Sequence, residues 1–167
     1  GVLNALVAKQ KGARVIVSEL MEKKIRVAEQ LGLEVIDGSK VDPVEEVRAR
    51  TDGRGADTVI LAVAATAANK QGFAMLKKLH GKVLMFAAGY PAPELGVDAN
   101  KIHYGKMQIF GTFLGEFADF KESCHLLGSG EIDVSSLVDK EYPFDQIQQA
   151  FENAIIPGGY RTTVVMQ

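Results

Sequence analysis

RVIVSELMEKKIRVAEQLGLEVID, residues 14–37, holds two short β-branched runs on either side of a helical pattern. The runs 14–18 and 33–37 predict buried strands, because Val and Ile pack well on a covered sheet. Between them, residues 21–31 repeat apolar side chains at helical spacing until Gly32 ends the pattern. Strand, helix and strand at this spacing predict a βαβ unit and therefore a parallel sheet.

The same alternation continues on both sides of this unit. The expected helices cover residues 1–11, 43–50, 67–78 and 116–128, and the expected strands cover 57–63, 82–87 and 107–112. Because crossover connections are right-handed, the pattern predicts an α/β fold with a Rossmann-like, doubly wound parallel sheet.

The rhythm changes after Gly130. A strand over 137–143, a helix over 144–154 and a strand over 160–166 predict a small C-terminal β-α-β appendage. We therefore expect a dinucleotide-binding domain over residues 1–130 and a C-terminal segment over residues 131–167.

Composition excludes several classes of protein. The chain has 167 residues, 47% of them apolar and 24% charged, with a net charge of −2. These values indicate a globular domain and give no reason to expect nucleic acid or a membrane as a partner. The single cysteine, Cys124, excludes a disulfide within the chain and favours a cytoplasmic location. Its spacing to Phe117, Phe120 and Leu127 predicts a buried helix face.

A doubly wound domain normally begins with a strand, a glycine-rich turn and a helix. Here Gly1 already stands at the start of a helix, and Glu19 follows the strand 14–18 at the distance of the ribose-binding acid of a GxGxxG fingerprint. We interpret Gly1 as the last glycine of such a fingerprint, with the first strand missing. The alternatives are that Gly1 only marks where the chain starts and that Glu19 is a solvated charge.

The missing strand would lie between the strands 14–18 and 57–63, and both would lose a hydrogen-bonding partner. Three outcomes are open at this point. A preceding segment supplies the strand in a longer, N-terminally extended protein, which we favour. Otherwise a strand from the appendage or from a partner molecule fills the gap, or the fold is loosened there.

Glu19 also predicts the kind of dinucleotide. A carboxylate at this strand end accepts hydrogen bonds from ribose hydroxyls and repels a 2′-phosphate, which favours NAD over NADP. Lys23, Lys24 and Arg26 follow on the next helix and would soften this preference if one of them turned inward.

Several segments together resemble the medium-chain dehydrogenase/reductase superfamily, which includes zinc-dependent alcohol, polyol and threonine dehydrogenases. They are GVLNALVAKQKGARVIVSE (1–19), DPVEEVRARTDGRGADTVI (42–60), GKVLMFAAGYP (81–91), IHYGKMQIFGTF (102–113), LLGSGEIDVSSLV (126–138), YPFDQIQQAFE (142–152) and YRTTVVM (160–166). They occur in the order and spacing of the family and cover its cofactor-binding domain and C-terminal segment, without its N-terminal catalytic part.

The resemblance implies a set of cofactor-binding residues at the ends of strands. These are Gly1, Glu19, Ala62, Val63, Ala64, Ala65, Ala87, Ala88, Gly89, Thr112 and Phe113. Gly1 would be the third fingerprint glycine and Glu19 the ribose-binding acid. Residues 62–65 would line the adenine and ribose side, and the others the nicotinamide side. The alternative for the alanines is plain packing between helices and sheet.

The resemblance implies an NAD-dependent parent enzyme that moves a hydride between the nicotinamide and a small secondary alcohol, such as a polyol, a sugar alcohol or a threonine-like substrate. Zinc would act in the full-length enzyme, with ligands outside this chain. Cys124 and His125 are neighbours on a helix and point about 100° apart, so they do not form a metal clasp. We expect no catalytic residue and no metal ligand here, and an inactive chain on its own.

Residues 91–100 resemble the edge strand through which two such cofactor domains pair, and the alternation of Leu95 and Val97 with polar or small residues fits a short strand. We therefore expect a homodimer, with a surface loop as the alternative. Other functions stay open: a zinc-free, NADPH-dependent quinone or enoyl reductase, a module that binds nucleotide without catalysis, and a methyltransferase-like domain.

Overall fold

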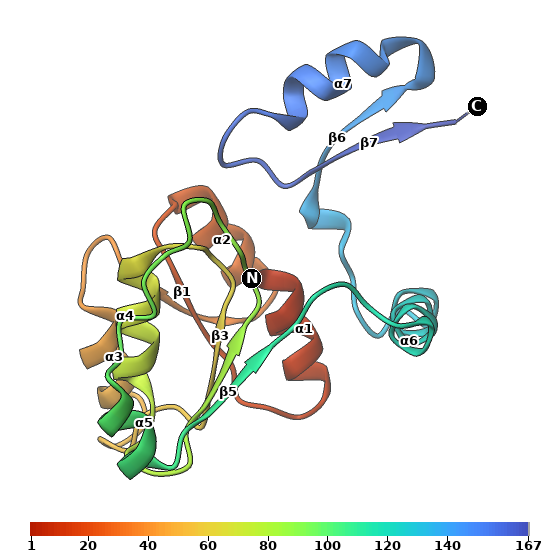
Figure 1. Cartoon of the computed structure of the whole chain (residues 1–167). Coiled ribbons are helices and arrows are strands. Elements are labelled where there is room, and N and C mark those ends of the chain that lie inside the picture. The colour runs from red at the N-terminus through yellow and green to blue at the C-terminus, as the bar shows by residue number, and fades with distance from the viewer. Residues whose placement is uncertain (167) are drawn as a thin grey trace.

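The computed structural model describes residues 1–166 and shows strands alternating with helices (Figure 1). The helices are α1 (Val2–Gln10), α2 (Glu22–Gln30), α3 (Pro43–Ala49), α4 (Thr66–Met75), α5 (Ala99–Gly105), α6 (Phe117–Gly128) and α7 (Ile147–Ala154). The strands are β1 (Ile16–Glu19), β2 (Glu34–Asp37), β3 (Thr58–Leu61), β4 (Lys82–Met85), β5 (Gln108–Gly111), β6 (Val138–Pro143) and β7 (Arg161–Val165). Short 3-10 turns cover Ser135–Leu137 and Phe144–Gln146.

All the paired strands run parallel, as expected for a doubly wound fold. β1 pairs with β2, and β3, β4 and β5 form a second group in that order. The sheet is interrupted between β1 and β3, where the sequence predicts the missing first strand. Within residues 1–166, β6 and β7 pair only with each other, so the idea that the appendage fills this gap is wrong.

Helices cover both faces of the β1–β2 pair. Val17 and Val35 pack with buried Ala5 of α1 and Ala28 of α2. Because neighbouring side chains of a strand point to opposite faces, Ile36 lies on the other side, where it packs with residues of α3 and α4. The apolar alternation of two four-residue strands therefore fixes α1 and α2 on one face and α3 and α4 on the other.

The second strand group has its own core. Val83 of β4 and Phe73 of α4 are almost completely buried and pack with Leu61 and Leu76. This cluster fixes α4 against β3 and β4, and so determines where the chain leaves both strands.

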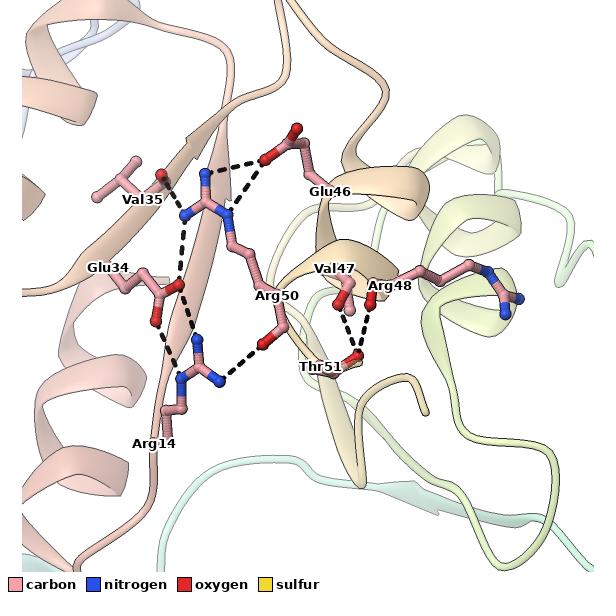
Figure 2. A network of polar contacts seen from close by, with 8 residues as sticks. All are labelled: Arg14, Glu34, Val35, Glu46, Val47, Arg48, Arg50 and Thr51. Atoms are coloured by element: carbon pink, nitrogen blue, oxygen red, sulfur yellow. Dashed lines mark hydrogen bonds and ion pairs between the residues drawn. The ribbon is translucent and has the colours of Figure 1, made fainter. Parts of the chain in front are cut away.

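A polar network ties β1, β2 and α3 together at the start of the strands (Figure 2). Arg14 binds both carboxylate oxygens of Glu34, at 3.1 and 3.0 Å. Arg50 donates to the same carboxylate at 3.4 Å, to the Val35 carbonyl at 3.1 Å and to Glu46 at 3.1 Å. Glu34 therefore bridges two arginines, and this network lies at the end of the strands opposite to Glu19.

The segment 91–100 forms no strand within this chain. No part of residues 1–166 pairs with residues 91–98, so their pairing with a second copy stays a prediction. The helix α5 follows, which the sequence pattern did not predict; its first turn is capped by the Asp98 carboxylate, which accepts the Lys101 N–H at 2.9 Å. Asp98 is an N-cap residue, a type that often marks the start of a helix. The strand-like alternation around Leu95 and Val97 obscured this signal.

The prediction of a buried Cys124 is also wrong. Cys124 is exposed, and Phe117 and Phe120 on the same helix are 82% and 68% exposed. Figure 1 shows α6 standing apart from the sheet. An ion pair of 2.6 Å between Lys11 and Glu122 tethers it to the end of α1. Helical spacing predicts which side chains share a face, but not whether a sheet lies opposite that face.

The C-terminal β-α-β unit is present as expected, with α7 covering the parallel pair β6–β7 and Ala150 buried beneath it. The domain boundary at residue 130 stays a prediction.

Candidate functional site

The predicted cofactor residues gather at one edge of the sheet. Leu61 lies opposite Met85, and Met85 lies opposite Gly111, so β3, β4 and β5 end side by side. The segments 62–65, 86–89 and 112–113 all leave the sheet there. In open parallel sheets, ligands bind outside these carboxyl ends of the strands.

The start of α1 meets this edge. A Cβ atom added to Gly1 would lie 3.8 Å from the Ala62 Cβ, so the two predicted residues are neighbours. The Gly1 carbonyl accepts the Ala5 N–H at 3.1 Å, which opens the helix. The first turn of α1 has neither an acidic residue nor a side-chain cap. Its N–H groups and the positive end of the helix dipole therefore suit a phosphate group.

The ends of β3 and β4 pack without space to spare. The Leu61 carbonyl accepts the N–H groups of both Phe86 and Ala87, at 3.1 and 3.0 Å. A Cβ atom at Gly89 would lie 2.8 Å from the Ala64 Cβ, closer than two carbon atoms can approach. Only glycine allows the chain after β4 to cross the chain after β3 here.

The nicotinamide side of the edge is open. Phe113 is 89% exposed, and Ala88 and Thr112 are exposed as well. On the adenosine side, Val63 is 57% exposed. A cavity of about 450 Å³ lies elsewhere, between the ends of α3, α4 and α5, and none of the predicted cofactor residues lines it. Within this chain, the predicted site is therefore an exposed surface at the ends of the strands and not a closed pocket.

Glu19 ends β1 with its carboxylate held in place by the backbone. Its Oε1 atom accepts the N–H groups of Leu20 and Met21 at 2.7 and 3.1 Å. These two bonds use Oε1, so Oε2 is the oxygen with lone pairs left for a ribose hydroxyl. The side chains of Glu19 and Lys24 lie near the Gly1 nitrogen, so both charges lie near the start of α1.

The cations after Glu19 take different partners. Arg26 pairs with Glu22 one turn earlier on α2. Lys23 instead reaches the C-terminal unit, where its Nζ lies 2.8 Å from Asp139 Oδ2. Sequence reasoning missed Asp139, because the two residues are 116 positions apart and no local pattern links them.

Residues 1–166 offer no fit for a metal ion. No group of three or more His, Cys, Asp or Glu side chains in this part of the chain lies close enough to hold one. His125 faces Glu131 at 3.6 Å, but the exposed Cys124 joins no such group. No step of a reaction is therefore derived through a metal in this chain.

Comparison with known proteins identifies the family of this chain. A sequence model described as zinc-binding dehydrogenase matches residues 1–129. The chain belongs to this family. This zinc-binding dehydrogenase chain is 32% identical over 156 residues to the sorbitol dehydrogenase of Halalkalibacterium halodurans. The match covers 90% of this chain and 44% of that protein. It therefore spans less than half the length of this curated relative.

Solved structures of the family have the same fold. Benzyl alcohol dehydrogenase from Acinetobacter calcoaceticus superposes with a TM-score of 0.86 at 26% identity, over 100% of this chain and 47% of that one. A zinc-binding dehydrogenase from Sinorhizobium meliloti 1021, solved with NADP, superposes with a TM-score of 0.87 at 22% identity, over 99% and 49%. The medium-chain dehydrogenase/reductase assignment from the sequence is confirmed. No helix within residues 1–166 is long and apolar enough to span a bilayer.

Proposed function

We propose that this chain is the NAD-binding part of a zinc-binding dehydrogenase that moves a hydride between a small secondary alcohol, of the polyol or sugar-alcohol class, and a nicotinamide. One observation carries the proposal: the start of α1, Glu19 and the carboxyl ends of β3, β4 and β5 meet at one edge. The polyol class is supported by the similarity to a sorbitol dehydrogenase.

Each part of the edge has a role in this proposal. The N–H groups at the start of α1 bind the pyrophosphate, Glu19 accepts a ribose hydroxyl through Oε2, and Ala62–Ala65 line the adenosine side. The segments 87–89 and 112–113 hold the nicotinamide face in position for transfer. When bound, the nicotinamide supplies the hydride-carrying carbon. Zinc, with ligands outside these residues, belongs to the proposal for the whole protein, as does a cytoplasmic location.

A zinc-free, NADPH-dependent reductase is the second candidate. The Sinorhizobium meliloti protein, itself a zinc-binding dehydrogenase, supports only that this fold can hold NADP. Here the carboxylate of Glu19 opposes a 2′-phosphate, so NAD is the better fit. A module that binds NAD without turnover is the third candidate.

The test uses the protein as its gene encodes it. We expect calorimetric titration to give tighter binding of NAD than of NADP, and no binding of S-adenosylmethionine. We also expect NAD reduction with sorbitol or a related polyol, abolished by a zinc chelator. Tighter binding of NADP would support the reductase, NAD binding without turnover of any alcohol would support the binding module, and binding of S-adenosylmethionine alone would support the methyltransferase.

We also propose that residues 91–100 pair two copies of the protein. Leu95 is 38% exposed, and residues 91–98 have no strand partner within residues 1–166. Val97 packs against the buried cluster of Leu61 and Phe73, so the test changes Leu95 alone. Leu95→Asp places like charges in such a pair, and we expect the particle mass measured by light scattering to halve. An unchanged mass in this variant would contradict pairing at this segment. Lys101→Asp, on the neighbouring α5, is the control.

A further inference from the structure

The C-terminal unit contacts the domain beside the predicted ribose site. Asp139 of β6 is the centre of this contact: its Oδ2 atom lies 2.8 Å from Lys23 Nζ and accepts the Tyr160 N–H at 2.6 Å. The Lys23 ammonium also lies 5.9 Å from the centroid of the Tyr160 ring. Figure 1 shows the chain that leads into β7 close to the α2 end of the domain.

This contact adjoins Glu19. Lys23 is four residues after Glu19, in the first turn of α2. Burial raises the pKa of Tyr160, and the nearby carboxylates of Glu19 and Asp139 raise it further. The Tyr160 hydroxyl is buried and has no hydrogen-bond partner within the described residues. Glu19, Lys23, Asp139 and Tyr160 therefore form one cluster, which we call the ribose-end cluster.

The ion pair joins an exposed lysine to a partly buried aspartate. The Lys23 side chain is 53% exposed and that of Asp139 is 19% exposed, and the Lys23 ammonium, followed by the Tyr160 N–H, lowers the pKa of the Asp139 carboxyl group. Asp139, which also accepts the Tyr160 N–H, holds the Lys23 ammonium at the C-terminal unit.

We propose that Asp139 is a specificity-determining residue for the dinucleotide, because it holds Lys23 away from the position that a 2′-phosphate would take beside Glu19. This inference rests on the proposed NAD-binding function. With Asp139 in place, the Glu19 carboxylate repels a 2′-phosphate, and the Lys23 ammonium does not offset this repulsion. Without Asp139, the Lys23 stem is free to swing toward the phosphate and form a charge-assisted hydrogen bond.

The test measures the dissociation constants of NAD and NADP by calorimetry for the protein as its gene encodes it and for Asp139→Asn. We expect NADP to bind about tenfold more tightly to the variant, as a hydrogen bond between two charged groups permits. We expect NAD binding to change by less than about twofold, because NAD has an uncharged 2′-hydroxyl where NADP has a phosphate, and a neutral acceptor binds an ammonium more weakly than a charged one.

Two double variants identify the cation. Lys23→Ala combined with Asp139→Asn is expected to lose the gain in NADP affinity, while Lys24→Ala combined with Asp139→Asn is expected to keep it. Asp57→Asn is the matched control, because Asp57 pairs with Lys77 at 2.7 Å outside the ribose-end cluster, and we expect no change in preference. Asp139→Ser removes the same charge and replaces the Asn variant if that variant does not fold.

The outcomes are distinct. An unchanged ratio of NADP to NAD affinity in folded Asp139 variants overturns the inference while leaving the proposed function intact. A gain that survives removal of Lys23 also overturns it. Failure of the unaltered protein to bind either dinucleotide overturns the proposed function, and this inference with it.

Discussion

Glu19→Ala is expected to weaken NAD binding about tenfold to hundredfold, since it removes hydrogen bonds from ribose hydroxyls to a charged acceptor. NADP binding should weaken far less, or strengthen, because the variant also removes a negative charge beside the 2′-phosphate. Calorimetric titration of both dinucleotides gives the two effects separately.

The structure provides the controls for this experiment. Glu19 also accepts the N–H groups of Leu20 and Met21, so the Ala variant should lose about 1 kcal/mol of stability as well. Glu19→Gln keeps an oxygen acceptor for these N–H groups and isolates the effect of charge. Asp57→Ala removes a carboxylate that pairs with Lys77, outside the ribose site, and should leave both affinities unchanged. An unchanged preference in the Glu19 variants would remove this residue from the ribose site.

Gly55→Ala is expected to lower the free energy of unfolding by about 3 kcal/mol or more. Gly55 has a φ of +85°, and a Cβ atom there would lie 2.7 Å from the Met75 carbonyl oxygen and 2.9 Å from that of Leu76. These are backbone atoms at the end of α4, where the Ala56 N–H donates to the same Met75 carbonyl at 2.8 Å. These carbonyl groups cannot move away from an added Cβ atom without breaking the Ala56–Met75 hydrogen bond, which lies just before β3.

Gly53 is the matched control for this variant. It has a φ of +75° in the same turn, but a Cβ atom there would meet nothing within 4 Å. Gly53→Ala should therefore cost only the left-handed backbone conformation, about 1 kcal/mol. Urea unfolding followed by circular dichroism measures both variants. Equal losses at the two positions would show that the contact with α4 has no energetic weight.

Much of the fold follows from local patterns. The β-branched runs at 14–18 and 33–37 predict strands that the structure places at Ile16–Glu19 and Glu34–Asp37. Even the gap in the sheet was predictable, because the distance from Gly1 to Glu19 is that of a fingerprint helix whose strand should stand between β1 and β3. The proximity of Gly1 to Ala62 and of Ala64 to Gly89 accords with the predicted site, while the roles of these residues stay predictions.

Apart from α5, the sequence by itself determined the element types and their order along the chain, because helical and strand periodicities depend on residues a few positions apart. Only the tertiary structure decided which faces are covered and which distant charges meet. The sequence of α6 predicts a buried apolar face, yet this face is exposed because no strand within residues 1–166 lies against it. The sequence predicts Lys23 as a solvated charge, yet it forms an ion pair with Asp139, 116 positions away in the chain. Such contacts depend on how the chain folds back on itself.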